Sequence, residues 1–144
     1  MIECLNCRDI LKCYNIRKIS RNISIQKTIK KIVKDGPCVL VGLCADYALA
    51  DHSNVLSFYI HADLNTRIRR IARICDVTDS KALDMINETD TTRCNYYNFY
   101  TGKSWGHADS YHMCLDSSIL GIDGTAEIIK QLVRIKENSL DKKL

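Results

Sequence analysis

The fold class follows from one short stretch of the chain, Gly36-Pro37-Cys38-Val39-Leu40-Val41-Gly42. A glycine past a helix end, followed by a proline, is a stop signal, so we expect a helix from about Ser20 or Ser24 to Lys34 to end here. The continuous apolar run Cys38–Gly42 is typical of a strand buried on both faces, as in a parallel sheet. A helix followed directly by such a strand favours an α/β protein.

Two more apolar runs repeat this pattern, Val55–Ile60 and Tyr111–Leu115. Each is followed by helical signals, and regular alternation of strands and helices is the pattern of α/β chains. Further helices are predicted over Asp79–Thr89 and Asp123–Asn138, and the segment Thr91–Tyr100 can also be helical. The sequence therefore predicts a parallel sheet flanked by helices.

The helix predicted over Leu64–Cys75 has a clear apolar stripe and a cap at Asp63. At 100° per residue, Arg69 and Arg73 fall on the opposite face of this helix. In contrast, Arg67 and Arg70 fall on the border of the stripe. Border arginines lie close to the body of a protein, where they can turn towards a cleft.

Composition places the chain among soluble globular proteins. It has 144 residues, 46% of them apolar and 26% charged, which excludes intrinsic disorder and favours a single domain over residues 1–144. No apolar run approaches the ~20 residues of a membrane span, and the start has no signal-peptide pattern. The net charge of +4 is mild and its basic residues are not clustered. We therefore expect a cytoplasmic protein that binds neither nucleic acid nor membrane.

Eight cysteines are many for a cytoplasmic protein. Cys38, Cys75 and Cys114 stand at apolar positions of predicted elements, so we expect them to be small core residues. The group Cys4-x-x-Cys7 with Cys13 is the only metal-like cluster in the sequence. Tetrahedral zinc needs four ligands, usually in two pairs, and no second pair follows. The spacing is therefore taken as accidental, and no metal site is predicted.

Three weaker patterns bear on phosphate binding. Gly102-Lys103-Ser104 matches the last part of a P-loop, but Tyr97 stands where the motif needs glycine, so Lys103 is a turn lysine or a simple phosphate contact. Asp116-Ser117-Ser118 follows the last strand, at the sheet edge where ligands bind in α/β proteins, although capping of the next helix suffices to explain it. Arginines bind phosphate through paired donors, which makes Arg67, Arg70 and Arg93 candidates.

Taken together, these segments resemble the cytidylate kinase-like family over about residues 20 to 138. The most distinctive part is the tyrosine-rich block Asn95–Gly106, preceded by Thr89-Asp90 and Arg93. The other matching segments are Gly36–Gly42, Cys44–Tyr47, Phe58–Leu64, Arg67–Ile71, Tyr111–Leu115 and Ser117–Ile122.

The resemblance implies the nucleoside monophosphate kinase fold, a three-layer α/β/α parallel sheet, and transfer of the γ-phosphoryl group of ATP to CMP or dCMP with Mg²⁺. It implies a mobile lid over about residues 76–106. Within that lid, Arg93 is expected to be the catalytic arginine that stabilises the transferring phosphoryl group. Asp46 would face the acceptor nucleotide, and Arg67 and Arg70, which match positions bordering the nucleotide cleft, would bind substrate. Lys103 is added as a substrate-binding candidate from its place in the Gly102-Lys103-Ser104 turn.

Two departures from the family pattern limit this expectation. The family begins with a strand and a glycine-rich P-loop, whereas no glycine precedes Gly36 here, and Leu43 replaces an arginine of the family. The first interpretation is therefore a truncated member with little or no kinase activity alone. One alternative is a half-kinase that receives its P-loop from another chain and then binds ATP and Mg²⁺. A second is a non-catalytic nucleotide-binding or regulatory protein, and a third is a stable remnant without a ligand.

The missing strand also has a structural consequence. By resemblance it would lie between Cys38–Gly42 and Val55–Ile60, and its absence leaves unpaired backbone groups on both. The two strands could pair directly, residues Ile2–Cys7 could replace the missing strand, or a second chain could supply one. The apolar surface left on the flanking helices favours the last solution, so we expect a homodimer.

Overall fold

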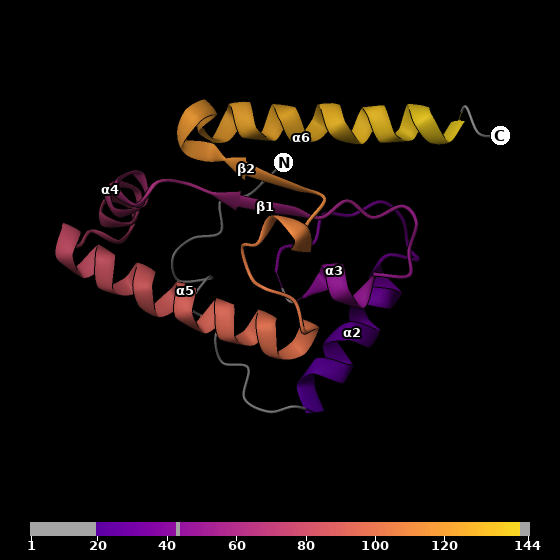
Figure 1. The fold of residues 1–144 in the computed structure, drawn as a ribbon, viewed down its shortest axis with the longest axis horizontal. Coiled ribbons are helices and arrows are strands. Elements are labelled where there is room, and N and C mark those ends of the chain that lie inside the picture. Colours follow the sequence, from indigo (N-terminus) through magenta and orange to yellow (C-terminus); the bar gives the residue numbers. More distant parts are fainter. Residues whose placement is uncertain (1–19, 43, 142–144) are drawn as a thin grey trace.

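The computed structural model describes residues 20–42 and 44–141, a helix-rich chain with one small sheet (Figure 1). Its elements in chain order are α2 (Ser20–Ile32), α3 (Ala45–Ala48), β1 (Phe58–His61), α4 (Leu64–Cys75), α5 (Asp79–Thr101), the 3-10 turn η1 (Ala108–Ser110), β2 (Met113–Asp116) and α6 (Ser117–Asp141). None of the helices in these ranges combines the length and apolar character that crossing a membrane requires.

The sheet consists of β1 and β2, which run parallel with Phe58 opposite Met113 and His61 opposite Asp116. In Figure 1 the two strands lie between α6 on one side and α5 on the other. Helix α6 contacts both strands, α4 packs against α5, and α2 packs against α3. Strand–helix alternation around a parallel sheet is thereby confirmed for the segments that follow residue 55.

The strand predicted at Cys38–Gly42 is wrong for this structure. These residues join no ladder, and the sheet in the described residues holds two strands rather than a wide three-layer core. Leu40 packs against the core, whereas Val39 and Val41 are 85% and 72% exposed. Val39, Leu40 and Val41 thus alternate as in a strand, whereas Cys38 and Gly42 are exposed, and no neighbour among the described residues supplies ladder hydrogen bonds. Cys38 is exposed, so its predicted core role is also wrong.

A compact apolar cluster joins α2 to α3. Ile29, Ala45, Ala48 and Leu49 are its buried members. The half-buried side chains around it are Ile25, Val33, Leu40 and Val55. This cluster fixes the position of α3, the short helix that carries Asp46.

The prediction for α4 is confirmed in both its cap and its faces. Asp63 Oδ1 accepts a hydrogen bond from the Thr66 backbone N–H at 2.9 Å, which satisfies one free donor of the first turn. Arg69 and Arg73 are exposed, while Arg67 and Arg70 are half-buried. The apolar stripe of this helix therefore determined which arginines lie against the protein.

Helix α5 is one continuous element where the sequence indicated two. The threonine-rich region near residue 90 does not break it, because the Thr92 hydroxyl donates to the Glu88 carbonyl at 2.8 Å within the helix. Gly102 ends the helix in the left-handed region (φ 67°), and its N–H donates to the Asn98 carbonyl at 3.0 Å. The turn predicted at Gly102 is confirmed.

Helix α6 begins directly after β2 and includes the helix predicted over Asp123–Asn138. Gly121 interrupts its first turn with φ 67° and ψ −176°, a conformation open mainly to glycine. The Thr125 hydroxyl donates to the Gly121 carbonyl at 2.6 Å and so restores a hydrogen bond at the break. The longer part of α6 then passes above the loops that precede the strands (Figure 1).

Candidate functional site

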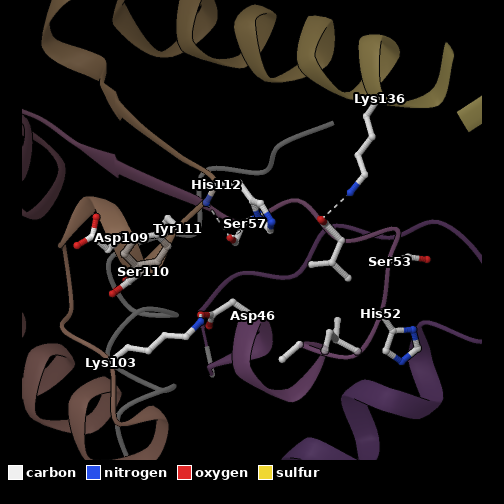
Figure 2. Close-up of a pocket in the computed structure, with 13 residues that line it drawn as sticks. Asp46, His52, Ser53, Ser57, Lys103, Asp109, Ser110, Tyr111, His112 and Lys136 are labelled. Carbon is white, nitrogen blue, oxygen red and sulfur yellow. Dashed lines mark hydrogen bonds and ion pairs between the residues drawn. The ribbon is translucent and has the colours of Figure 1, made fainter. Parts of the chain in front are cut away.

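A pocket of about 460 Å³ lies at the amino ends of β1 and β2. Ser57 and His112, which immediately precede the two strands, form part of its wall (Figure 2). The lining residues are Asp46, Leu49, Ala50, His52, Ser53, Val55, Ser57, Lys103, Asp109, Ser110, Tyr111, His112 and Lys136. They come from α3 and the loop after it, the turn after α5, η1 and α6.

Asp46 and Lys103, both predicted to bind substrate, meet in this pocket. Asp46 stands in the first turn of α3, and Lys103 follows the helix-ending Gly102. Lys103 Nζ lies 3.4 Å from Asp46 Oδ2, although the residues are 57 positions apart in sequence. The Asp46 side chain is only 14% exposed, so the carboxylate is partly removed from water and neutralised by a single lysine.

A second donor reaches the same oxygen of Asp46. The hydroxyl of Tyr97 donates to Asp46 Oδ2 at 2.7 Å from the interior of α5. Tyr97 is a buried residue, so this contact links the body of α5 to the pocket wall. Burial raises the pKa of Tyr97, and the hydrogen bond to the Asp46 carboxylate raises it further. Tyr97 therefore remains a neutral donor at any physiological pH.

Stacked rings extend from Tyr97 to the sheet. Tyr97 stacks on Tyr111 with ring centroids 5.7 Å apart, and Tyr111 stacks on Tyr59 of β1 at 5.2 Å. Trp105 meets the Tyr59 ring edge-on at 5.4 Å. Gly106 is needed beside it, because a Cβ at that position would lie 3.0 Å from the Tyr59 hydroxyl oxygen. Within the distinctive Asn95–Gly106 block, Tyr97, Trp105 and Gly106 thus contribute to internal packing, whereas Phe99 is exposed.

Ser57 and His112, which immediately precede β1 and β2, are hydrogen-bonded to each other. His112 Nδ1 accepts from the Ser57 backbone N–H at 3.0 Å and lies 2.7 Å from Ser57 Oγ. The backbone N–H of His112 in turn donates to Ser57 Oγ at 3.1 Å. Because Nδ1 is an acceptor here, we assign the ring proton of the neutral imidazole to Nε2.

Lys136 reaches the pocket from the C-terminal helix, where its Nζ donates to the Val55 carbonyl at 2.8 Å (Figure 2). Sequence reasoning missed Ser57, His112 and Lys136 as pocket residues. The first two fall inside the strands predicted at Val55–Ile60 and Tyr111–Leu115, whereas the observed strands begin only after them, at Phe58 and Met113. Nothing local in the sequence distinguishes Lys136 from the other lysines of α6.

The three predicted arginines do not line the pocket. Arg67 pairs with Asp90 of α5 at 2.7 Å, and Arg70 follows one turn later on α4. Arg93 is exposed, one turn after Asp90 on α5. Burial, and next the charge of Asp90, raises the pKa of Tyr59, while Arg67 and Arg93 lower it. Arg67, Arg70 and Arg93 are thus not brought together with Asp46 and Lys103 in the pocket.

The carboxyl ends of the strands carry capping interactions. The backbone N–H of Ser118 donates to Asp116 Oδ1 at 2.9 Å, and its hydroxyl contacts the same oxygen. The Asp63 backbone N–H donates to Ser118 Oγ at 3.1 Å, and Ser117 Oγ donates to the His61 carbonyl at 2.9 Å. Capping alone thus accounts for the Asp116-Ser117-Ser118 segment.

The described residues contain no group of three or more histidine, cysteine or acidic side chains arranged to hold a metal ion. Leu43 and the Cys4, Cys7 and Cys13 cluster lie outside the described residues, as does the segment Ile2–Cys7. The prediction that the cysteine spacing is accidental therefore stays a prediction.

Comparison with known proteins identifies a family and a similar solved structure. The model of the cytidylate kinase-like family matches residues 10–119, a range that contains all five predicted site residues. No curated protein matches the sequence. The crystal structure of an uncharacterized protein from Eubacterium ventriosum is similar to this chain, with a TM-score of 0.74 and 26% identity over 87% of this chain and 71% of that chain.

Proposed function

The chain belongs to the cytidylate kinase-like family, and from this premise we propose that its pocket binds a pyrimidine nucleoside monophosphate, CMP or dCMP. The proposal rests on one observation, the meeting of Asp46 and Lys103 in a single pocket. The resemblance implies that Asp46 faces the acceptor nucleotide, and the turn at Gly102-Lys103-Ser104 makes Lys103 a candidate phosphate contact. A volume of about 460 Å³ is within the range of small-molecule sites.

The chemistry of the two residues suits the two ends of such a nucleotide. An ionised carboxylate only accepts hydrogen bonds, so Asp46 selects ligand donors, such as the exocyclic amino group of cytosine. The Lys103 ammonium offers a positive charge to a phosphate. The side of the pocket that carries Lys136 and His112 adds further N–H groups (Figure 2).

The proposed function does not include phosphoryl transfer by this chain alone. ATP phosphates are held by a glycine-rich loop, and the 144 residues contain no glycine before Gly36. The residues present therefore do not fit ATP with Mg²⁺, and we derive no transfer step from them. Arg93, with Arg67 and Arg70, is proposed to act on a phosphoryl group only in a completed site, with α5 as the lid.

Binding is tested by calorimetry with CMP on the wild-type chain and on Asp46→Asn, which keeps the size of the side chain. We expect wild type to bind CMP and Asp46→Asn to bind it at least about tenfold more weakly, since a hydrogen bond to a charged group contributes about 1.5–3 kcal/mol. Equal affinity of the two proteins, or no binding by wild type, would reject the proposal.

Activity is tested separately, with ATP and CMP on a preparation free of contaminating kinases. We expect no turnover, because the triphosphate has no preformed site in these residues. A rate on the order of 1–100 s⁻¹, typical of kinases, would contradict this part of the proposal.

A second candidate is a half-kinase completed by another chain, and the exposed Val39 and Val41 favour it. Their segment alternates like a strand but has no ladder partner among the described residues, so it is open to pairing. A P-loop strand from a partner would complete a three-layer sheet, and a second copy of this chain would make a homodimer.

Light scattering across a dilution series tests the homodimer, and a monomer at all concentrations rejects it. CMP binding without any ATP binding would instead support a non-catalytic regulatory role.

A further inference from the structure

Tyr97 makes the shortest polar contact of Asp46, although it does not line the pocket itself. Its side chain belongs to a residue that is only 6% exposed, and its hydroxyl lies 2.7 Å from Asp46 Oδ2. Lys103 Nζ approaches the same oxygen at 3.4 Å. Two donors from the α5 side therefore share one carboxylate oxygen.

The other oxygen of Asp46 is left for a ligand. Within the described residues, Asp46 Oδ1 makes no hydrogen bond, while the carboxylate lines the pocket. Because Oδ2 is held by Tyr97 and Lys103, rotation of the carboxylate would break both contacts. The arrangement therefore fixes the plane of the carboxylate and leaves one of its two equivalent oxygens, Oδ1 in this structure, without a hydrogen bond from the described residues.

The Tyr97 hydroxyl is itself held in place by packing. Its ring stacks on Tyr111, which stacks on Tyr59 of the sheet, and Trp105 blocks the edge of Tyr59. A ring fixed by stacked neighbours retains one rotamer, so its hydroxyl oxygen stays at one point. A flexible lysine cannot provide this, because its ammonium moves on a four-carbon stem.

We propose that Tyr97 is a positioning residue of the pocket, whose hydroxyl holds Asp46 Oδ2 so that Oδ1 faces the ligand and selects ligands with a donor at that point. The inference rests on the proposed function in that the ligand is taken to be a nucleotide. The hydrogen bond between Tyr97 and Asp46 is observed whether or not the ligand is a nucleotide. Tyr97 touches no ligand in this scheme and acts only through Asp46.

The test compares Tyr97→Phe with Tyr100→Phe, the same chemical change one turn later on α5. CMP and UMP are used as probes, because UMP has a carbonyl acceptor where CMP has an amino donor. We expect Tyr97→Phe to lower CMP affinity about tenfold while changing UMP affinity much less. Tyr100→Phe should leave both unchanged, since no hydrogen bond of its hydroxyl is seen in the described residues.

A purely structural role for Tyr97 predicts a different result, an equal loss of affinity for both nucleotides. That result, or an unchanged CMP affinity in Tyr97→Phe, would overturn the inference. Circular dichroism of both phenylalanine variants checks that each retains the fold, which is expected because the buried ring is kept.

A second readout needs no ligand. The ring ¹³Cζ signal of Tyr97, identified as the one missing from Tyr97→Phe, should move in Asp46→Asn, because the hydroxyl loses its ionised acceptor. The Tyr100 signal should stay in place. A Tyr97 signal that does not move would overturn the contact itself. A signal that moves in a protein that does not bind CMP would leave the contact established and reject the proposed nucleotide function.

Discussion

The two ends of the β1–β2 sheet hold polar residues in different ways. At the amino ends, Asp46 is largely buried and is contacted by Tyr97 of α5 and by Lys103 of the turn after α5. Beside α4, which follows the carboxyl end of β1, Arg67 pairs with Asp90 while both side chains remain about one quarter to one third exposed. The first arrangement is braced by stacked rings, and the second is an ion pair near water. The difference indicates that the first region is built to hold a group still, while the second can rearrange.

The largest expected effect contrasts the stability of the two regions. Tyr97→Ala removes a buried ring that is stacked on Tyr111, so it should lower the free energy of unfolding by about 3–5 kcal/mol. Arg67→Ala removes a partly exposed ion pair and should cost only about 0–1 kcal/mol. Urea denaturation of both variants measures this contrast. Similar losses in the two variants would show that the regions do not differ in rigidity.

The next effect is the loss of CMP affinity when the charge of Lys103 is removed from the pocket. Lys103→Met keeps the apolar stem but removes the charge, so CMP affinity should fall about tenfold, the lower end expected for loss of one hydrogen bond to a charged group. Affinity for cytidine, which has no phosphate, should change little. Calorimetry with both ligands measures the difference. A parallel loss for cytidine would mean that Lys103 acts through Asp46 rather than on the phosphate.

A smaller effect is expected from the arginine side. Arg93 is exposed and lies away from the pocket, so Arg93→Ala should lower CMP affinity by at most about threefold, and added salt should remove that difference. Titrations at low and high ionic strength test this. Should Arg93→Ala match or exceed the loss in Lys103→Met, the two regions would have to act as one site in the presence of the ligand.

The smallest effect concerns acid sensitivity at the start of α4. Hydrogen bonds from Thr66 hold the pKa of Asp63 below its ordinary value of 3.8. A carboxyl group with a lowered pKa in the folded state stabilises the fold above its unfolded pKa and loses this contribution as pH falls through the folded pKa.

Asp63→Asn keeps a good N-cap residue but does not titrate. Its stability should therefore fall less than that of wild type when the pH is lowered from about 6 to about 3. Urea midpoints across this range give the comparison, with Asp51→Asn in an exposed loop as the control. If Asp63→Asn and wild type lost stability in parallel, the Asp63 cap would make no pH-dependent contribution.

The sequence predicted the elements that depend on local signals. The Asp63 cap, the faces of α4 and the turn at Gly102 all follow from residues within one or two helical turns. The resemblance named Asp46 and the turn pattern named Lys103, but neither predicted that the two residues meet, which is seen only in the structure. Local patterns therefore sufficed for the helices, while the pocket required long-range information.

The errors have a common physical origin in long-range pairing. The Cys38–Gly42 run has the composition of a strand, but a strand exists only with a partner, and Val39 remains exposed without one. The sequence also favoured the carboxyl ends of the strands as the ligand edge, whereas the pocket lies at Ser57 and His112, before the strands begin. Lys136 joins that pocket because α6 passes over it, which no local pattern predicts.

Helix α5 connects the two regions mechanically. Asp90, which holds Arg67, and Tyr97, which holds Asp46, are separated by seven residues of one unbroken helix, about 10 Å along its axis. Both polar contacts are therefore held by the same helix, and any displacement of α5 as a rigid body would reach Tyr97 and Asp90 together. Because α4 packs against α5, such a displacement would also involve the helix that carries Arg67.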